Sequence, residues 1–98
     1  MEVRLHNRYR MLKIRRTEEV EFVLLALSGR IEERDVPRLQ ELVDQDAKAG
    51  AVTLDLEEVR LVDREAVRFL AACESQGVRL QNCPSYVRKW IHTGSDQS

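Results

Sequence analysis

The chain has 98 residues, of which 43% are hydrophobic and 34% charged, with 4 glycines, 2 prolines and a net charge of −1 at pH 7. This is the composition of a soluble globular domain, and it excludes a disordered or fibrous chain. The sequence has no apolar run of about 18 residues, the length that spans a bilayer. It therefore predicts a protein without membrane insertion and with a cytoplasmic location.

Charge is distributed unevenly along the chain. Residues 1–16 carry a net charge of +5 and residues 17–65 a net charge of −8. The basic end alone would suggest a nucleic-acid partner, but the acidic body would repel a polyanion. We therefore expect no nucleic acid as a partner. Cys73 and Cys83 lack the close ligand spacing of a zinc site, so we expect two reduced thiols.

The first two elements are predicted to form a β-hairpin. In residues 10–16, Leu12 and Ile14 alternate with charged residues, which is typical of an edge strand with one solvated face. Residues 17–19 are polar and predict a tight turn. Residues 20–28 are apolar on both faces, which predicts a central strand covered on both sides, or nearly so.

A helix is predicted over residues 35–49, followed by a buried strand over 51–56. Asp35 is the expected N-cap, Pro37 fits the first turn, and Gly50 suits the position that ends the helix. The strand is rich in β-branched and aliphatic residues. Together with the second strand of the hairpin, these segments predict a strand–helix–strand unit.

The next segments predict a loop and a second helix. Residues 57–62 are interpreted as a loop with apolar plugs, and the helix runs over 64–75 with Asp63 as its N-cap and Gly77 after its end. Apolar residues at helical spacing form the inner face of this helix. The loop plugs are Val59, Leu61 and Val62, and the inner face is Ala66, Val67, Leu70, Ala71 and Cys73.

The chain then predicts a short strand over 78–82 and a last helix over 84–92 that begins at Pro84. The apolar stripe of this helix contains Tyr86, Val87, Trp90 and Ile91. The two aromatic residues are interpreted as core or edge-covering residues, with a core position favoured over an exposed anchor for a partner. The tail over residues 93–98 is polar and is predicted to be disordered.

The element order β-β-α-β-α-β-α predicts the α/β class. Repeated strand–helix–strand units favour parallel strands joined by right-handed crossovers, which place the helices on one face. We expect a two-layer domain with a mixed, mostly parallel four-stranded sheet. Residues 1–92 are predicted to form this single domain.

Three stretches in this order resemble the STAS domain, the family named for sulphate transporters and antagonists of anti-sigma factors. LALSGRIEERDVPRLQEL is similar to the family's "LSGELD" stretch before its first helix. LDLEEVRLVDREAVRFL is similar to its "DLSGVTFIDSSGLGVLL" segment, and GVRLQNCPSYVRKWI to its "GGxLxLxNCSPxVRRLL" segment. The resemblance covers roughly residues 10–92. It implies a sheet with helices on one face and a non-enzymatic, protein-binding function without a cofactor.

The resemblance also locates a regulatory position. In family members that bind anti-sigma kinases, the "DSSG" junction carries a serine or threonine whose phosphorylation blocks partner binding. Asp63 matches the aspartate of this motif, Arg64 and Glu65 stand at its two serines, and Ala66 at its glycine. The phosphorylated serine therefore corresponds to Glu65, which cannot be phosphorylated. Glu65 is either an ordinary first-turn charge or a partial imitation of phosphoserine.

By this resemblance the expected partner is an anti-sigma factor or a kinase-like regulatory protein. The alternative is an accessory subunit of a lipid or anion transport complex, with a transporter ATPase as its partner. Family members usually continue with a further strand and helix after the equivalent of Ile91. We therefore expect a minimal version of the domain, or a sheet edge covered by a partner or a second copy as a homodimer.

The expected partner-binding surface is the 57–63 loop and the start of the following helix. It comprises Val59, Arg60, Asp63, Arg64, Glu65 and Arg68. No catalytic triad, phosphate-binding loop or metal-ligand spacing is present, and His6 and His92 have no partner in the pattern. The acids Glu57, Glu58, Asp63 and Glu65 are interpreted as a solvated cluster rather than a divalent cation site.

Overall fold

The structure, a computed structural model, describes residues 11–97, with side chains described up to residue 92. Its four-stranded sheet has the order β1-β2-β3-β4, with β1 antiparallel to β2 and the other neighbours parallel. The strands are β1 (Lys13–Glu18), β2 (Phe22–Ile31), β3 (Ala51–Val62) and β4 (Arg79–Gln81). The predicted mixed, mostly parallel sheet is confirmed.

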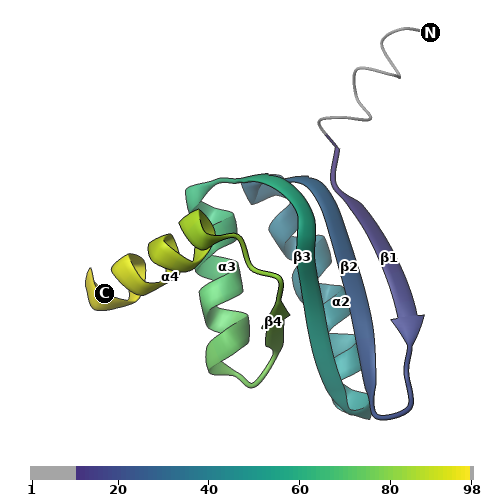
Figure 1. Cartoon of the computed structure of the whole chain (residues 1–98). Helices are drawn as coiled ribbons and strands as arrows, with labels where there is room; N and C mark the ends of the chain where they lie inside the picture. Colours follow the sequence, from purple (N-terminus) through teal and green to yellow (C-terminus); the bar gives the residue numbers. More distant parts are fainter. Residues whose placement is uncertain (1–10, 98) are drawn as a thin grey trace, which may run out of the picture.

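The helices are the short 3-10 helix η1 (Glu33–Asp35), α2 (Val36–Ala49), α3 (Arg64–Ser75) and α4 (Ser85–Gln97). Helices α2 and α3 lie side by side behind the sheet, and α4 extends outward near the start of α3 (Figure 1). This arrangement has the predicted two layers. The core between them collects buried residues from β2, β3 and every α-helix.

The hairpin lies later in the sequence than predicted. Thr17 and Glu18 belong to β1 rather than to the turn, and Arg10 lies outside the described residues. The turn is formed by residues 19–21, and the Glu19 N–H donates to the Phe22 carbonyl oxygen at 2.8 Å. Leu12 and Ile14 face the core, as their alternation predicts.

Among the described residues, helices cover β2 on one face only, so the predicted cover on both sides, or nearly so, is complete on one face and partial on the other. Leu25, Leu27 and Ile31 face the helices and are buried, whereas Leu24 and Ala26 are only partly buried. Right-handed crossovers place the helices on the same side and leave the other face open. Apolar residues on both faces therefore did not require two covering layers.

Gly29 is required where β2 passes the start of the first strand. It has φ of 92°, and a Cβ at this position would collide with the carbonyl oxygen of Met11. The pairing of β2 with β3 also shifts register on both sides of Gly29. A residue with a side chain would therefore meet both steric and backbone strain here.

Asp35 occupies the N-cap position of α2, as predicted, but its side chain does not cap this helix. Its Oδ2 atom accepts from the Glu32 N–H at 2.9 Å and closes the η1 turn, and α2 begins at Val36 without a side-chain cap. Pro37 lies in the first turn of α2, as predicted. Gly50 follows the helix with an extended backbone rather than the left-handed one expected of a helix-ending glycine.

The predicted loop over residues 57–62 is instead the second half of β3. It pairs with residues 28–31 of β2 through an irregular register. Val59 and Val62 are buried, whereas Leu61 is 46% exposed. The side chains of Glu57 and Glu58 are exposed, and this leaves the backbone free to pair as a strand.

The last helix extends beyond the predicted range and carries its aromatic residues outside the core. Val87 and Ile91 are buried, but Tyr86 is 42% and Trp90 50% exposed, so the favoured core position for these two aromatic residues is wrong. The backbone of α4 continues to Gln97. The disorder predicted for residues 93–98 stays a prediction.

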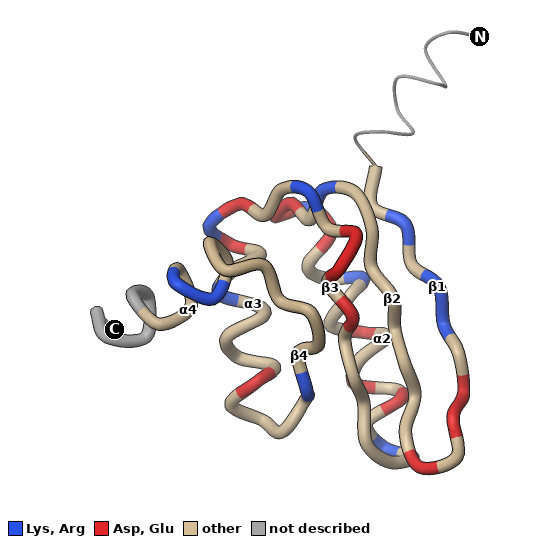
Figure 2. The backbone as a smooth tube through the Cα atoms, in the orientation of Figure 1, with Lys and Arg blue, Asp and Glu red and all other residues tan. Residues whose placement is uncertain are grey.

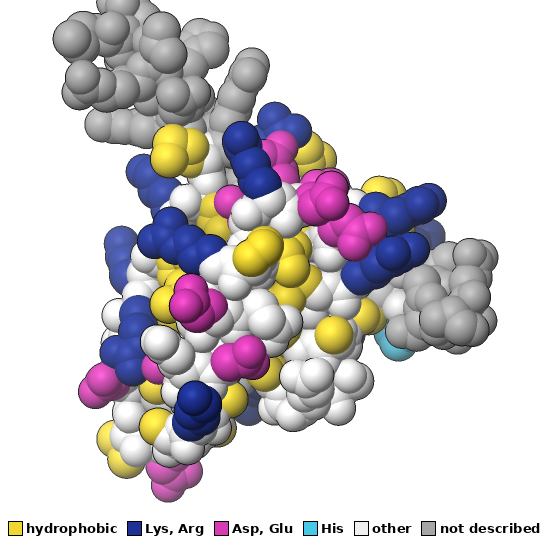
Figure 3. All heavy atoms as spheres, turned by 180° about the vertical axis from the view of Figure 1, so that it is seen from behind, with side chains coloured by type: hydrophobic (Ala, Val, Ile, Leu, Met, Phe, Trp, Pro, Cys, Tyr) yellow, Lys and Arg dark blue, Asp and Glu magenta, His cyan; other side chains and the backbone are white. Residues whose placement is uncertain are grey.

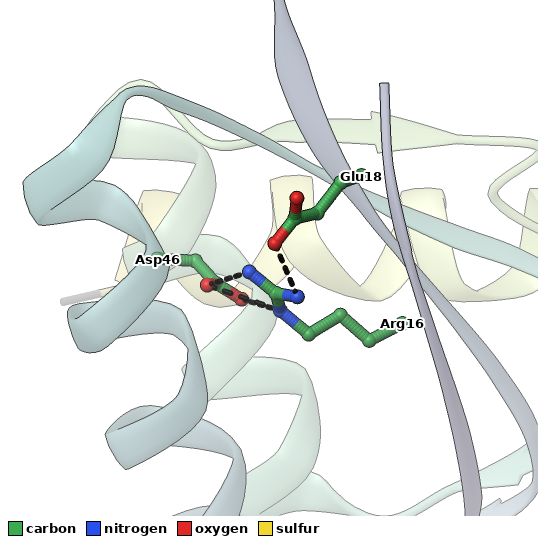
Figure 4. Close-up of polar contacts among 3 residues, drawn as sticks. All are labelled: Arg16, Glu18 and Asp46. Atoms are coloured by element: carbon green, nitrogen blue, oxygen red, sulfur yellow. Dashed lines mark hydrogen bonds and ion pairs between the residues drawn. The ribbon is translucent and has the colours of Figure 1, made fainter. Parts of the chain in front are cut away.

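Arg16 ties the edge strand to the first helix. Its guanidinium donates to both carboxylate oxygens of Asp46 on α2, at 2.9 to 3.2 Å, and to Glu18 at 2.9 Å (Figure 4). These contacts, chiefly the Asp46 hydrogen bonds, raise the pKa of Arg16 further above its ordinary range. Arg16 is therefore paired within the molecule and links β1 to α2.

Both cysteines are free thiols. Cys73 is buried in the core, and this burial raises the pKa of its thiol to about 12. Cys83 is half-buried, and burial raises its pKa as well. Neither thiol has the lowered pKa of a reactive cysteine. Among the described residues, no helix is long and apolar enough to cross a membrane.

Candidate functional site: the junction of β3 and α3

Asp63 joins two segments of the chain at the end of β3. Its Oδ1 atom accepts from the Ala66 N–H at 2.9 Å, which confirms Asp63 as the N-cap of α3. Its Oδ2 atom accepts from the Glu33 N–H at 2.8 Å, thirty residues away in the sequence. The Asp63 N–H also donates to the Ile31 carbonyl oxygen at 3.2 Å. One carboxylate therefore fixes both the start of α3 and the η1 turn.

The η1 turn is part of this site, although it was absent from the predicted set. Glu33 and Arg34 are exposed beside Asp63, and Arg34 forms an ion pair with Glu32 at 3.2 Å. The strand topology could have indicated that Glu33 and Arg34 lie at this site. Because β2 and β3 are parallel, the residues that follow each strand meet at the same edge of the sheet.

The first turns of α3 present charged side chains to solvent. Arg64 and Arg68 are exposed, and Glu65 is half-exposed. The Glu65 carboxylate forms an ion pair with Arg68 at 3.3 Å, one turn along the helix. Glu65 is the second residue of α3, where a negative charge also faces the positive end of the helix dipole.

The two predicted site residues on β3 differ in access. The side chain of Val59 is 7% exposed and belongs to the core, so it is not available to a partner. Arg60 is exposed, and its carbonyl oxygen accepts from the Tyr86 hydroxyl at 3.1 Å. This bond joins α4 to the site. The pKa of Tyr86 is raised, mainly by burial of the phenol, which keeps the hydroxyl a donor.

Five of the six predicted residues have charged side chains that are exposed or partly exposed, and they lie between the end of β3 and the second turn of α3. We define the β3–α3 surface as Arg60, Asp63, Arg64, Glu65 and Arg68 together with Glu33 and Arg34 of η1. From behind, the helix-bearing side shows basic and acidic side chains intermingled around hydrophobic ones (Figure 3). Mixed charge of this kind suits a protein surface better than a polyanion.

Four acids, Glu57, Glu58, Asp63 and Glu65, lie along the second half of β3 and the start of α3. Within residues 11–97, no group of three or more His, Cys, Asp or Glu side chains is placed to hold a metal ion. His92 is exposed, and His6 lies outside the described residues. A shallow hollow of about 270 Å³ lies at the opposite end of β3, lined by residues 18–23 and 49–51 with Arg16. It contains none of the predicted site residues.

No family model and no curated protein matches the chain. Several solved structures do match the chain. An anti-sigma factor antagonist from Mycobacterium paratuberculosis superposes with a TM-score of 0.67 and 19% identity, over 89% of this chain and 81% of that one. The STAS domain of an anti-sigma factor antagonist from Rhodobacter sphaeroides gives a TM-score of 0.60 and 12% identity, over 74% and 87%.

A third structure, of a protein named Mglu, is 26% identical over 71% of this chain but only 19% of that chain, with a TM-score of 0.54. The first two structures match most of both chains and carry the same kind of mixed sheet. At these identities the likeness concerns the backbone. The chain has the fold of a STAS domain.

Proposed function

We propose that this chain is a non-enzymatic regulatory module that binds a partner protein, in the manner of an anti-sigma factor antagonist. Two solved structures with the same fold are antagonists of this kind. The observation that carries the proposal is the double hydrogen bond of Asp63, which holds the η1 turn against the start of α3. A preorganised surface of this kind binds with less loss of conformational entropy. The module acts in the cytoplasm.

The β3–α3 surface offers cations for a charged partner. No described residue forms an ion pair with Arg60 or Arg64, and both side chains are exposed. Arginine is enriched at the energetic centres of protein interfaces because its planar fork pairs with carboxylates. The partner is therefore an anti-sigma factor or kinase-like protein that presents acidic residues to these two arginines.

Glu65 replaces the phosphorylated position, so partner binding is not switched there. Its carboxylate already pairs with Arg68. A carboxylate has two acceptor oxygens where a phosphate has three, and it carries about half to two-thirds of the phosphate's negative charge. The ion pair favours the role of a first-turn helix charge over an imitation of phosphoserine. The module is then permanently competent to bind.

The first experiment uses calorimetry to measure how tightly the chain binds the anti-sigma factors that are encoded in the same genome. Arg60→Glu and Arg64→Glu are each expected to weaken binding by about tenfold or more, because each replaces an attraction by a repulsion. Arg79→Glu, an exposed arginine on the distant edge strand β4, is the matched control and should leave affinity unchanged. Equal affinity for all four proteins would contradict the proposed surface. Selective binding of a transporter ATPase would favour the accessory-subunit alternative.

The second experiment replaces Glu65 by Ser and by Gln. If Glu65 is a helix charge, both variants should bind the partner within about threefold of the unchanged chain, since exposed charges contribute little. Tightening by about tenfold or more in both variants would instead establish an inhibitory imitation of phosphoserine. Arg68→Gln, which removes only the ion-pair partner, separates the effect of the carboxylate from that of its pairing.

A further inference from the structure

Within residues 11–97, no strand lies beside the outer edge of β1. β1 is the first strand of the sheet and pairs with β2 on one side only. All its residues except Ile14 are exposed. A free edge presents a row of backbone N–H and C=O groups to which another strand can bond. The other edge differs, because β4 has only three residues and is followed by α4.

Charge is polarised along this edge. Its first half carries Lys13 and Arg15, and its end and the following turn carry Glu18, Glu19 and Glu21. Figure 2 shows this division, with the basic positions in the half of β1 nearer the N-terminus and the acidic ones around the turn.

Four of these side chains are free to meet a neighbour. No described residue pairs with the side chains of Lys13, Arg15, Glu19 or Glu21. Arg16 does not compete with them because its guanidinium is engaged by Asp46 and Glu18 on the helix side (Figure 4).

We propose that a second copy of this chain pairs with β1 in antiparallel orientation, so that the two sheets become one eight-stranded sheet about a two-fold axis. An antiparallel copy places the basic half of each β1 beside the acidic end of the other. A parallel copy would place like charges side by side. The charge pattern thus selects both the occupant and its direction.

Two exposed apolar side chains support the same orientation. Met11, just before β1, is 54% exposed, and Val20, in the turn just after it, is 98% exposed. In an antiparallel pair, the Met11 end of one copy lies toward the Val20 end of the other. The association therefore covers apolar surface at both ends of the paired strands.

The dimer is weak and depends on salt. A six-residue strand pair buries less than the roughly 800 Å² per partner of a standard stable interface. Its charge pairs are exposed, so salt screens them over a distance of about 10 Å at 0.1 M. We therefore expect association to appear at high protein concentration and low ionic strength, and to weaken as salt is added.

The test uses sedimentation equilibrium of the full chain from about 10 μM to about 1 mM, at about 50 mM and about 500 mM salt. Two variants reverse opposite halves of the edge: Lys13→Glu with Arg15→Glu, and Glu19→Lys with Glu21→Lys. Each variant alone should remain monomeric because the four reversed or retained charges at positions 13, 15, 19 and 21 then have one sign, while Arg16 and Glu18 stay paired with each other. Mixed in equal amounts, the two should form a heterodimer at low salt.

Arg79→Glu on β4 is the control and should dimerise like the unchanged chain. Circular dichroism confirms that each variant is folded. An unchanged chain that stays monomeric at about 1 mM and low salt would overturn the proposal. So would a dimer that survives both charge reversals, or a mixture of the two variants without heterodimer.

Amide hydrogen exchange identifies the occupant of the edge. The outward-facing amides of β1 should exchange rapidly in dilute protein and become protected as concentration rises. Protection that is already complete in dilute, monomeric protein would show that another part of the same chain covers the edge, and would equally overturn the proposal.

Discussion

At the residue scale, Asp63 is the side chain on which the proposed surface depends. Half of its role could be predicted from the sequence, because an aspartate before an amphipathic run is a common N-cap. The bond to the Glu33 N–H could not, since it joins residues thirty positions apart and depends on the parallel pairing of β2 with β3. The identity of a cap is local information, whereas its second partner is set by topology.

We expect Asp63→Ala to lower the free energy of unfolding by about 1–3 kcal/mol, because two backbone N–H groups lose their acceptor. The stability of Asp63→Asn should lie between those of the unchanged chain and Asp63→Ala, since an amide keeps only one acceptor oxygen. Urea unfolding measures both. Glu65→Ala, in the same turn but half-exposed, is the control and should change stability by no more than about 0.5 kcal/mol. A loss for Asp63→Ala as small as that of the control would contradict the bridging role.

At the element scale, the order and type of the elements could be predicted, but several boundaries and environments could not. The sequence predicts a loop over residues 57–62, yet the backbone of this segment is hydrogen-bonded to β2. The hydrophobic pattern of a sequence indicates which side chains are buried. A strand whose side chains are exposed therefore shows the same pattern as a loop. Val59 was thus placed on the partner surface when it belongs to the core.

The same limit applies to the aromatic residues of α4. A stripe containing Tyr86 and Trp90 at helical spacing indicates an apolar face, but its width exceeds what the rest of the structure covers. Only Val87 and Ile91 reach the core. Which part of an apolar stripe is covered depends on the neighbouring helix α3, and this contact has no local signature.

We therefore expect truncation on α4 to destabilise the protein more at Val87 than at Trp90. Val87→Ala should lower the free energy of unfolding by about 2 kcal/mol, because it leaves a cavity among buried side chains. Trp90→Ala should cost less than about 1 kcal/mol despite removing a far larger side chain, because half of that side chain is already in water. Urea unfolding followed by circular dichroism measures both. A larger loss for Trp90→Ala would mean that the tryptophan is a core residue.

At the scale of the whole molecule, the topology follows from the element order and the handedness of the crossovers. These two facts predicted the mixed sheet and the helix layer without any knowledge of side-chain contacts. They also imply that the molecule has distinct surfaces. The β3–α3 surface lies at the end of the central strands, and the free edge of β1 lies along the side of the sheet (Figure 1). Binding a partner and binding a second copy therefore use different parts of the fold.

The final prediction concerns the cooperativity of the whole chain. The buried residues of β2, α2, β3, α3 and α4 form one hydrophobic cluster, so unfolding any of these elements exposes part of the same core. We expect a single two-state transition in urea for the monomer. Two tryptophan probes test this: the natural Trp90 on α4, and Phe22→Trp in a Trp90→Phe background, at the start of β2. Both fluorescence transitions should share the midpoint seen by circular dichroism. A Trp90 fluorescence transition at a lower urea concentration than the other two would contradict this expectation. It would show that α4 unfolds separately, without exposing the rest of the core.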